Sequence, residues 1–334
     1  CLSFSLLAQE PHSALSSQKA TYNGNALSLK GAVILEHEIG KMEAEEALLD
    51  KQNEHPDFPF SSVHLEHNVR VFLKDSSSLL CEQADFDFSS LKGSLFSPNQ
   101  VIYQGILKQQ APFFLKGKKA DLTFSKKDEE IQIESVKMEE NVEVEYETIY
   151  SLFATEALYK EQESCLLISN PQGTLPAFGS FKEKACFSAH LLKWNLANSE
   201  MYLSQNVSVQ DPSLGNFLCE QTVYLLEKEG VLSFLKTEGK TVFTHLNQQT
   251  LTCFGGVTVD RGLKKAFFEP SSKQLTYQED QFTATGDHGV MEYEEIEEVF
   301  TPRLLVLEGN VQLVSSESTR SEERRVGKEC LRLC

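Results

Sequence analysis

The chain has 334 residues, and its 49 acidic and 31 basic side chains give a formal net charge of −18 at pH 7. So large an excess of negative charge argues against binding nucleic acid or another polyanion through a general basic surface. Phe (22 residues) and Tyr (9 residues) are abundant beside a single Trp, a composition that suits β-strands with a continuous apolar interior.

The amino-terminal residues from Cys1 to Ala8 are apolar or small, and the chain turns polar at Gln9. This stretch is too short to span a bilayer but is typical of the second half of a signal-peptide apolar region, with Ala8 at the cleavage point. We therefore expect residues 1–18 to be a signal-peptide remnant and leader of an exported protein. A lipid-modified Cys1 at the start of a mature lipoprotein is the alternative.

A short unit recurs along the chain, and such internal repeats decide the fold class. The motif Asn-Val-x-Val begins at Asn68, Asn141 and Asn206. At the same distance after the first Val of each copy stands a small residue, namely Cys81, Ala154 and Cys219. Looser copies are Gly31-Ala-Val33, Gly255-Gly-Val257 and Gly309-Asn-Val311.

Each unit has the pattern of strand, turn, strand. Apolar residues alternate with polar ones after the first Val, which predicts a strand with one dry and one wet face. The Asn or Gly before that Val suits a left-handed backbone position on entering the strand. Residues 43–51 have good helix propensity, but their place within a repeat favours a strand. The uneven steps between copies favour a long, open antiparallel array over a tight parallel β-helix.

The chain carries no catalytic pattern, so we expect a protein that is not an enzyme and has no cofactor or metal. His64 and His67 would point to opposite faces of a strand, which argues against a shared metal site. No Cys-x-x-Cys pair occurs, so Cys81 and Cys219 are predicted to be small buried side chains. A disulfide in an exported protein is the alternative.

The repeats divide into two expected halves, 19–165 and 166–315, with the boundary near Ser169–Pro176. From residue 316 to 334 the chain loses both strand alternation and acidic balance. We therefore expect this tail to be non-native and to lie outside the fold.

Two segments resemble the OstA-like repeats of periplasmic lipopolysaccharide-transport bridge proteins: Leu27-Ser-Leu-Lys-Gly-Ala-Val33 with its downstream Met42–Asp50, and Leu305-Val-Leu-Glu-Gly-Asn-Val-Gln-Leu313. The resemblance implies an all-β, elongated, open twisted β-jellyroll built from repeated strand-turn-strand units. It implies a Gram-negative periplasmic protein that bridges the inner and outer membranes and holds lipid A acyl chains in an apolar groove. Its partners would be lipopolysaccharide and other transport components joined end to end by β-strand contact, with a homo-oligomer as a further expectation.

The resemblance assigns the lining of such a groove to the inward positions of the repeats. These positions are Val33, Leu35, Val69, Val71, Val142, Val144, Val207, Val209, Val257, Val259, Val311 and Leu313. From the pattern alone, the same residues would equally fill a closed β-sandwich core. Two other functions stay open: a periplasmic domain of the outer-membrane lipopolysaccharide translocon, which shares the repeat, and an exported structural or adhesive β-solenoid.

Overall fold

The structure is a computed structural model. It describes residues 14–51, 60–106, 112–127, 130–147, 149–178, 183–228, 230–246, 248–280, 282–296, 299–315 and 331–333. These residues form antiparallel β-strands joined in an open sheet and no helix, which confirms the predicted all-β fold of repeated strand-turn-strand units. Within those ranges, no helix is long and apolar enough to cross a membrane.

The chain divides into two compact units. Unit 1 comprises residues 1–143 and 156–162, and unit 2 comprises residues 144–155 and 163–334. The division runs through β9 (Glu130–Tyr146) and β10 (Tyr150–Lys160), which contribute residues to both units.

Unit 1 is a meander in which each long strand bends once. Between β3 and β4 the pairing register shifts between Lys30 and Val33, and between β5 and β6 it shifts between Glu66 and Val69. Each of these long strands therefore contributes one half to each of two ladders, whereas the two short strands at the start of the unit pair with one half of the next strand each. The strands are β1 (Ala14–Ser16), β2 (Lys19–Tyr22), β3 (Ala26–His37), β4 (Gly40–Asp50), β5 (Ser62–Leu73), β6 (Ser78–Asp87), β7 (Lys92–Ile106) and β8 (Pro112–Lys127).

Two sequence expectations fall in unit 1. The segment with good helix propensity is the strand β4, so the preference for the repeat over local propensity is confirmed for residues 43–50. Residues 14–16 of the expected leader pair with residues 34–36 of β3 as β1. The rest of that leader, up to residue 13, lies outside the described residues.

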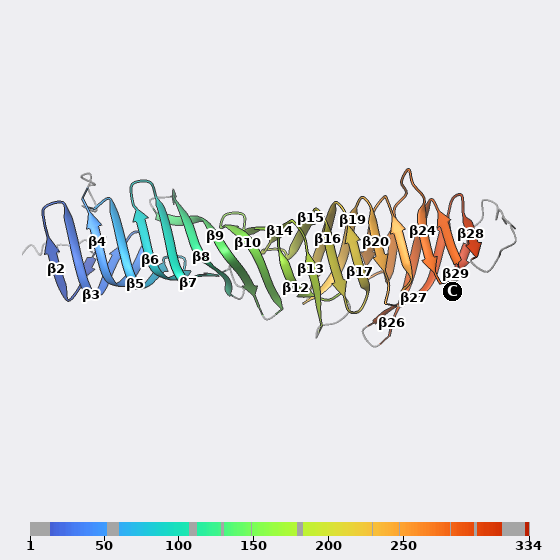
Figure 1. The fold of residues 1–334 in the computed structure, drawn as a ribbon, viewed down its shortest axis with the longest axis horizontal. Coiled ribbons are helices and arrows are strands. Elements are labelled where there is room, and N and C mark those ends of the chain that lie inside the picture. Colours follow the sequence, from blue (N-terminus) through green and yellow to red (C-terminus); the bar gives the residue numbers. More distant parts are fainter. Residues whose placement is uncertain are drawn as a thin grey trace, which may run out of the picture. The chain divides into compact units, whose positions relative to one another are not determined.

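Unit 2 has two ladders formed by separate short strands (Figure 1). Ladder A contains, in order of pairing, β11 (Cys165–Ser169), β14 (Leu191–Asn195), β15 (Glu200–Ser204), β18 (Thr222–Lys228), β19 (Val231–Glu238), β22 (Val257–Asp260), β23 (Lys265–Phe268), β26 (His288–Ile296) and β27 (Val299–Glu308). Ladder B contains β12 (Gln172–Pro176), β13 (Lys184–Ser188), β16 (Val207–Asp211), β17 (Gly215–Cys219), β20 (Thr241–Thr244), β21 (Thr250–Cys253), β24 (Leu275–Glu279), β25 (Phe282–Gly286) and β28 (Gln312–Ser315). The expected non-native tail contributes β29 (Leu331–Leu333), which pairs with residues 305–307 of β27.

The chain of unit 2 alternates between the ladders, one hairpin at a time. A hairpin of ladder B is followed by a crossing to ladder A, a hairpin there, and a crossing back. All crossings lie at one end of the strands, which we call the seam, and all hairpin turns lie at the other end, which we call the mouth. The ladders face each other, since Tyr150 beside ladder B packs on Trp194 of ladder A with ring centroids 4.6 Å apart.

The recurring Asn marks a bend between ladders. Asn68, Asn141 and Asn206 have φ of 55°, 56° and 53°, and the residue before each of them also has positive φ. Asn tolerates this left-handed conformation better than most residues with a side chain. The predicted left-handed position is therefore confirmed, and the two-residue left-handed step turns the chain from one ladder to the other.

Candidate functional site

The inward faces of unit 2 are continuous rows of apolar side chains. Cross-strand partners in ladder A form the row Leu166, Trp194, Met201, Leu225, Leu235, Val259, Ala266, Met291 and Leu305. Ladder B contributes the row Phe187, Val209, Phe217, Phe243, Leu251, Tyr277 and Ala284. No side chain of these two rows is more than 6 % exposed.

Unit 1 has the same arrangement with different side chains. One row alternates large and small residues across its strands as Leu29, Ala47, Leu65, Ala84, Leu95 and Ala120. The other row is Leu35, Met42, Val71, Leu79, Tyr103 and Leu115. All twelve are buried, so the interior of this unit is also apolar.

Eleven of the twelve predicted lining residues lie on inward faces and are at most 6 % exposed. They are Val33, Leu35, Val69, Val71, Val142, Val144, Val207, Val209, Val257, Val259 and Val311. Leu313 differs from these residues in its burial, because its side chain is 40 % exposed. Its partner Ala284 places it at the end of the inward row of ladder B, but β25 is the only neighbour of β28 among the described strands.

The mouth of unit 2 is bridged by contacts between the two ladders. The main-chain N–H of Leu232 in ladder A donates to the carbonyl oxygen of Ala177 at 3.1 Å. The N–H of Phe300 in β27 donates to the carbonyl oxygen of Ser213 at 3.1 Å. His245 lies in the turn after β20, and its Nε2 donates to the carbonyl oxygen of Phe300 at 3.0 Å. The inward residues at the mouth are thereby covered by protein.

A buried carboxylate organises the ladder B side of this mouth. Asp211 is 3 % exposed and begins the turn between β16 and β17. Its Oδ1 accepts from the N–H and hydroxyl of Ser213 and from the N–H of Leu214, at 2.9, 2.6 and 3.0 Å. Its Oδ2 accepts from the N–H of Phe178 at 2.6 Å. Four donors therefore compensate the burial of the carboxylate, and they tie two neighbouring hairpins together.

A buried histidine, His245, also lies at the mouth. It is 4 % exposed, and burial lowers its pKa below the usual value, although the hydrogen bond to Phe300 acts in the opposite direction. A lowered pKa keeps the imidazole neutral at pH 7. Because a carbonyl oxygen only accepts, the Nε2 proton is the one donated to Phe300.

Three buried thiols lie beside the bends between ladders. Cys81, Cys219 and Cys253 are free and 9 %, 3 % and 1 % exposed, so the prediction that Cys81 and Cys219 are small buried side chains is confirmed. The Sγ of Cys219 lies 3.4 and 3.3 Å from the carbonyl oxygens of Thr222 and Glu238. Desolvation raises the pKa of Cys81 to about 12, which makes its thiol unreactive at neutral pH.

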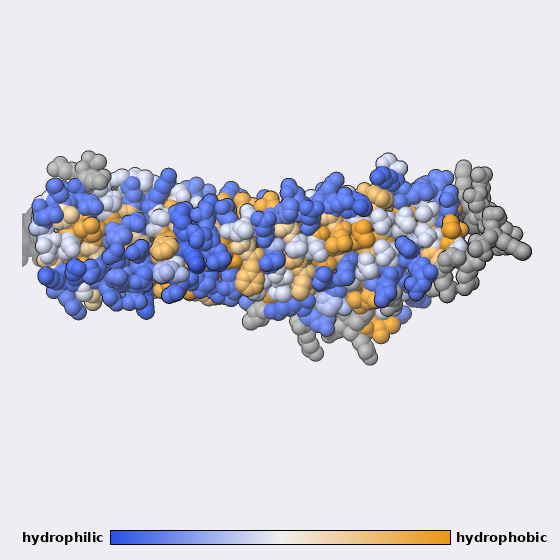
Figure 2. Space-filling model, in the orientation of Figure 1, coloured by the Kyte–Doolittle hydropathy of each residue, from blue (hydrophilic) through white to orange (hydrophobic). Residues whose placement is uncertain are grey.

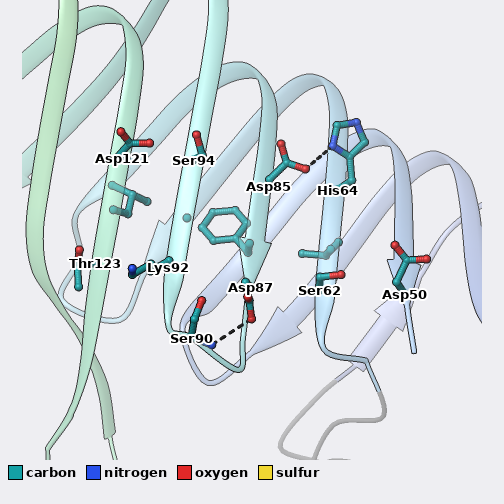
Figure 3. Close-up of a pocket in the computed structure, with 14 residues that line it drawn as sticks. Asp50, Ser62, His64, Asp85, Asp87, Ser90, Lys92, Ser94, Asp121 and Thr123 are labelled. Carbon is teal, nitrogen blue, oxygen red and sulfur yellow. Dashed lines mark hydrogen bonds and ion pairs between the residues drawn. The ribbon is translucent and has the colours of Figure 1, made fainter. Parts of the chain in front are cut away.

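A hollow of about 600 Å³ lies on unit 1 (Figure 3). It is lined by Asp50, Ser62, Val63, His64, Asp85, Phe86, Asp87, Ser90, Lys92, Gly93, Ser94, Asp121, Leu122 and Thr123. His64 contacts Asp85 at 2.6 Å and Glu66 at 3.0 Å. Desolvation is the largest influence and lowers the pKa of His64, but the bonds to the two carboxylates together raise it.

His64 and His67 do not form a joint site. His67 Nδ1 contacts Glu82 at 2.9 Å, whereas His64 contacts two other carboxylates. Within the described part of the chain, no group of three or more His, Cys, Asp or Glu residues is arranged to hold a metal ion.

The outer face is mainly hydrophilic, with separate hydrophobic patches in the view of Figure 2. Ion pairs join neighbouring strands on the outside of the sheet, among them Lys137 with Glu156 at 3.0 Å and Lys265 with Glu292 at 2.9 Å. Water screens exposed pairs of this kind, so they favour solubility more than folding.

No sequence pattern predicts the residues of the mouth. Asp211 and Ser213 stand in a segment whose composition indicates only a turn, and His245 is isolated in the sequence. Phe300 lies 55 residues from its partner His245, so no local pattern could connect them.

Scans of this sequence against models of known protein families and against curated proteins find no match. The resemblance to OstA-like repeats therefore stays a prediction that rests on the repeat motifs.

Proposed function

We propose that this protein is a periplasmic carrier that shields the acyl chains of lipopolysaccharide between its two ladders during transport to the outer membrane. The observation that carries the proposal is the connectivity of unit 2. The ladders are joined covalently only at the seam, and a continuous apolar row runs along the inner face of each ladder. Separation at the mouth would expose these rows without breaking the pairing of strands within either ladder.

The physical chemistry of the rows suits an acyl chain. Each methylene removed from water contributes about 0.8 kcal/mol, so contact along several methylenes would bind an acyl chain firmly. Neighbouring rungs present similar apolar side chains, as Phe217 and Phe243 do in ladder B. Sites of similar energy placed side by side would let a chain move along the row, while its sugars and phosphates stay in water.

The carrier would work with other lipopolysaccharide-transport components through end-to-end β-strand contacts. In unit 1 the first strands β1 and β2 pair with β3 alone among the described strands and are exposed along their length. Exposed strand edges of this kind are templates for pairing with another chain. A periplasmic domain of the translocon would use the same interior and the same edges.

A photocrosslinking experiment tests lipid carriage with two adjacent residues as a matched pair. Phe217 is 1 % exposed and faces inward, whereas Leu218 is 54 % exposed and faces outward on the same strand. We replace each in turn with p-benzoylphenylalanine and irradiate the folded protein with purified lipopolysaccharide. Crosslinking from position 217 and not from position 218 supports the carrier. Crosslinking from position 218 alone, or equally from both, contradicts it.

The second candidate function is an exported structural or adhesive β array. One observation favours it: the eleven inward residues are at most 6 % exposed, as in a closed core. In that case lipopolysaccharide would crosslink to neither position, although both variants keep the β-rich circular dichroism spectrum of the unmodified chain.

A further inference from the structure

We propose that the end of the β26–β27 hairpin is a strap that closes the part of the mouth of unit 2 formed by the turns after β16 and β20, and that its release opens the interior beneath these turns. The strap consists of residues 293–296 and 299–302. The ligand that would pass through the opening is the one assigned by the proposed function, but the strap itself can be tested without any ligand.

The strap leaves the ladder at a defined place. β23 pairs with β26 only as far as Lys265 opposite Glu292, and the register of β26 with β27 shifts directly after Glu292. Beyond this bulge the register pairs β26 with β27 alone. The strap keeps two contacts with the turn between β22 and β23: Tyr293 N–H donates to the carbonyl oxygen of Lys264 at 2.9 Å, and Glu295 pairs with Arg261 at 3.3 Å. A two-stranded hairpin is marginally stable by itself, so the position of the strap depends on what it touches.

Phe300 makes the contacts that hold the strap to ladder B. Its N–H donates to Ser213, its carbonyl oxygen accepts from His245, and its ring lies 5.5 Å from the ring of Phe178. These partners belong to three different turns of ladder B. The ring is 1 % exposed and also packs on Tyr293 within the strap, at 6.1 Å. One residue of the strap therefore connects three rim segments.

Release of these contacts would leave the strand pairing of both ladders intact. Phe300 makes two hydrogen bonds to ladder B, one to Ser213 and one from His245, and one ring contact with Phe178. None of these three contacts is part of the strand pairing within a ladder. Local openings of this kind have free energies well below that of global unfolding, because few bonds are lost. The strap is therefore built to open before the ladders do.

Native thiols report the opening of the interior. Cys219 and Cys253 belong to one inward row at the seam, with Thr241 between them, and are 3 % and 1 % exposed. A water-soluble maleimide reaches them only when the interior opens. Cys81 is a buried thiol of unit 1, 9 % exposed, and serves as the internal control.

The first test releases the strap with Phe300→Ala. We measure N-ethylmaleimide labelling of each cysteine by peptide mass spectrometry. The expected result is labelling of Cys219 and Cys253 at least about tenfold faster than in the wild type, with Cys81 unchanged. Phe187→Ala is the matched control, because it removes a buried Phe of the same unit at the seam end of β13. Equal acceleration in this control, acceleration of Cys81, or no acceleration at all would overturn the strap.

The second test locks the strap in the double variant Ser213→Cys with Phe300→Cys. The main-chain bond of 3.1 Å between these residues shows that their backbones are adjacent. Formation of the disulfide in the folded double variant is checked first, by mass spectrometry. Oxidised and reduced forms of the same protein are then compared, with each single variant treated alike. Labelling of Cys219 and Cys253 should be at least about tenfold slower in the oxidised form. Equal rates in both forms count against the strap.

A ligand arm separates failure of the strap from failure of the proposed function. The photoreactive residue at position 217 is added to the locked pair, and purified lipopolysaccharide is crosslinked to both forms. A difference in thiol labelling with no crosslink in either form keeps the strap and removes lipid carriage. Equal labelling with equal crosslinking keeps lipid carriage and removes the strap.

Discussion

The carboxylate of Asp211 accepts a 2.6 Å hydrogen bond from the main-chain N–H of Phe178, a residue 33 positions earlier in the chain. The bond joins the turn of the β12–β13 hairpin to the turn of the β16–β17 hairpin. Both belong to ladder B, and both meet residues of ladder A across the mouth through Ala177 and Ser213. The carboxylate thus aligns the two acceptors that ladder A uses.

Asp211→Ala should destabilise unit 2 strongly. Four buried donors would lose their acceptor, and we expect a loss of about 3 kcal/mol from the free energy of unfolding. The chain has a single Trp, Trp194, which is 1 % exposed in unit 2 and follows the unfolding of that unit in urea. Asp75→Ala is the control, since Asp75 accepts from Ser77 in a similar turn of unit 1. A urea midpoint unchanged by Asp211→Ala would contradict this role.

Unit 2 should lose stability on acidification through His245. The pKa of this group is lowered by burial in the folded state, whereas an unfolded His titrates near about 6.5. The unfolded chain therefore binds the proton first, so stability is complete above about pH 6.5 and falls as the pH drops below that value. His245→Gln keeps a donor for Phe300 but does not titrate.

The measurement compares urea midpoints from Trp194 fluorescence at pH 7.5 and pH 5.5 in the wild type and in His245→Gln. The wild type should show the larger decrease, since all other titrating groups are common to both proteins. An equal decrease in the two proteins would exclude His245 as the cause.

The bend at Asn206 should accept Gly and reject β-branched residues. Its φ of 53° lies in the left-handed region, where a β-branched side chain costs at least about 1 to 2 kcal/mol. We expect Asn206→Gly to be close to neutral and Asn206→Val to lower the urea midpoint of unit 2 clearly. Similar midpoints for both variants would show that the chain crosses between ladders without this conformation.

A carboxylate on the inward face should unfold unit 2, whereas one on the outward face should not. Val209 is 1 % exposed, and its neighbour Gln210 is exposed on the same strand. Val209→Asp would bury an unpaired charge and should cost more than about 3 kcal/mol. Gln210→Asp is the control and should change stability by less than about 0.5 kcal/mol. A small effect of Val209→Asp on unfolding would show that the interior admits water.

The sequence was sufficient for features that depend on local pattern. Alternation placed Val207 and Val209 on the inward face because side chains of a strand alternate strictly between faces. The Asn before each Val identified the left-handed bend because few other residues adopt that conformation.

The same repeats gave no information about which ladder a strand joins. Val207 lies in ladder B and Val257 in ladder A, although their motifs are related. Ladder membership depends on the count of preceding crossings, which is a property of the whole chain. The exposure of Leu313 on β28 was unpredictable for the same reason, because it depends on which strands pair with β28.

The alternation of hairpins between ladders restricts how the length of this protein can change. Removal of β18 and β19 alone would leave β17 and β20 in the same ladder with no crossing between them. Removal of Thr222–Cys253, which holds one hairpin from each ladder, would leave β17 followed by a crossing to β22. Relatives and designed variants of this chain should therefore differ in length by pairs of hairpins, each pair adding one step to both ladders at once.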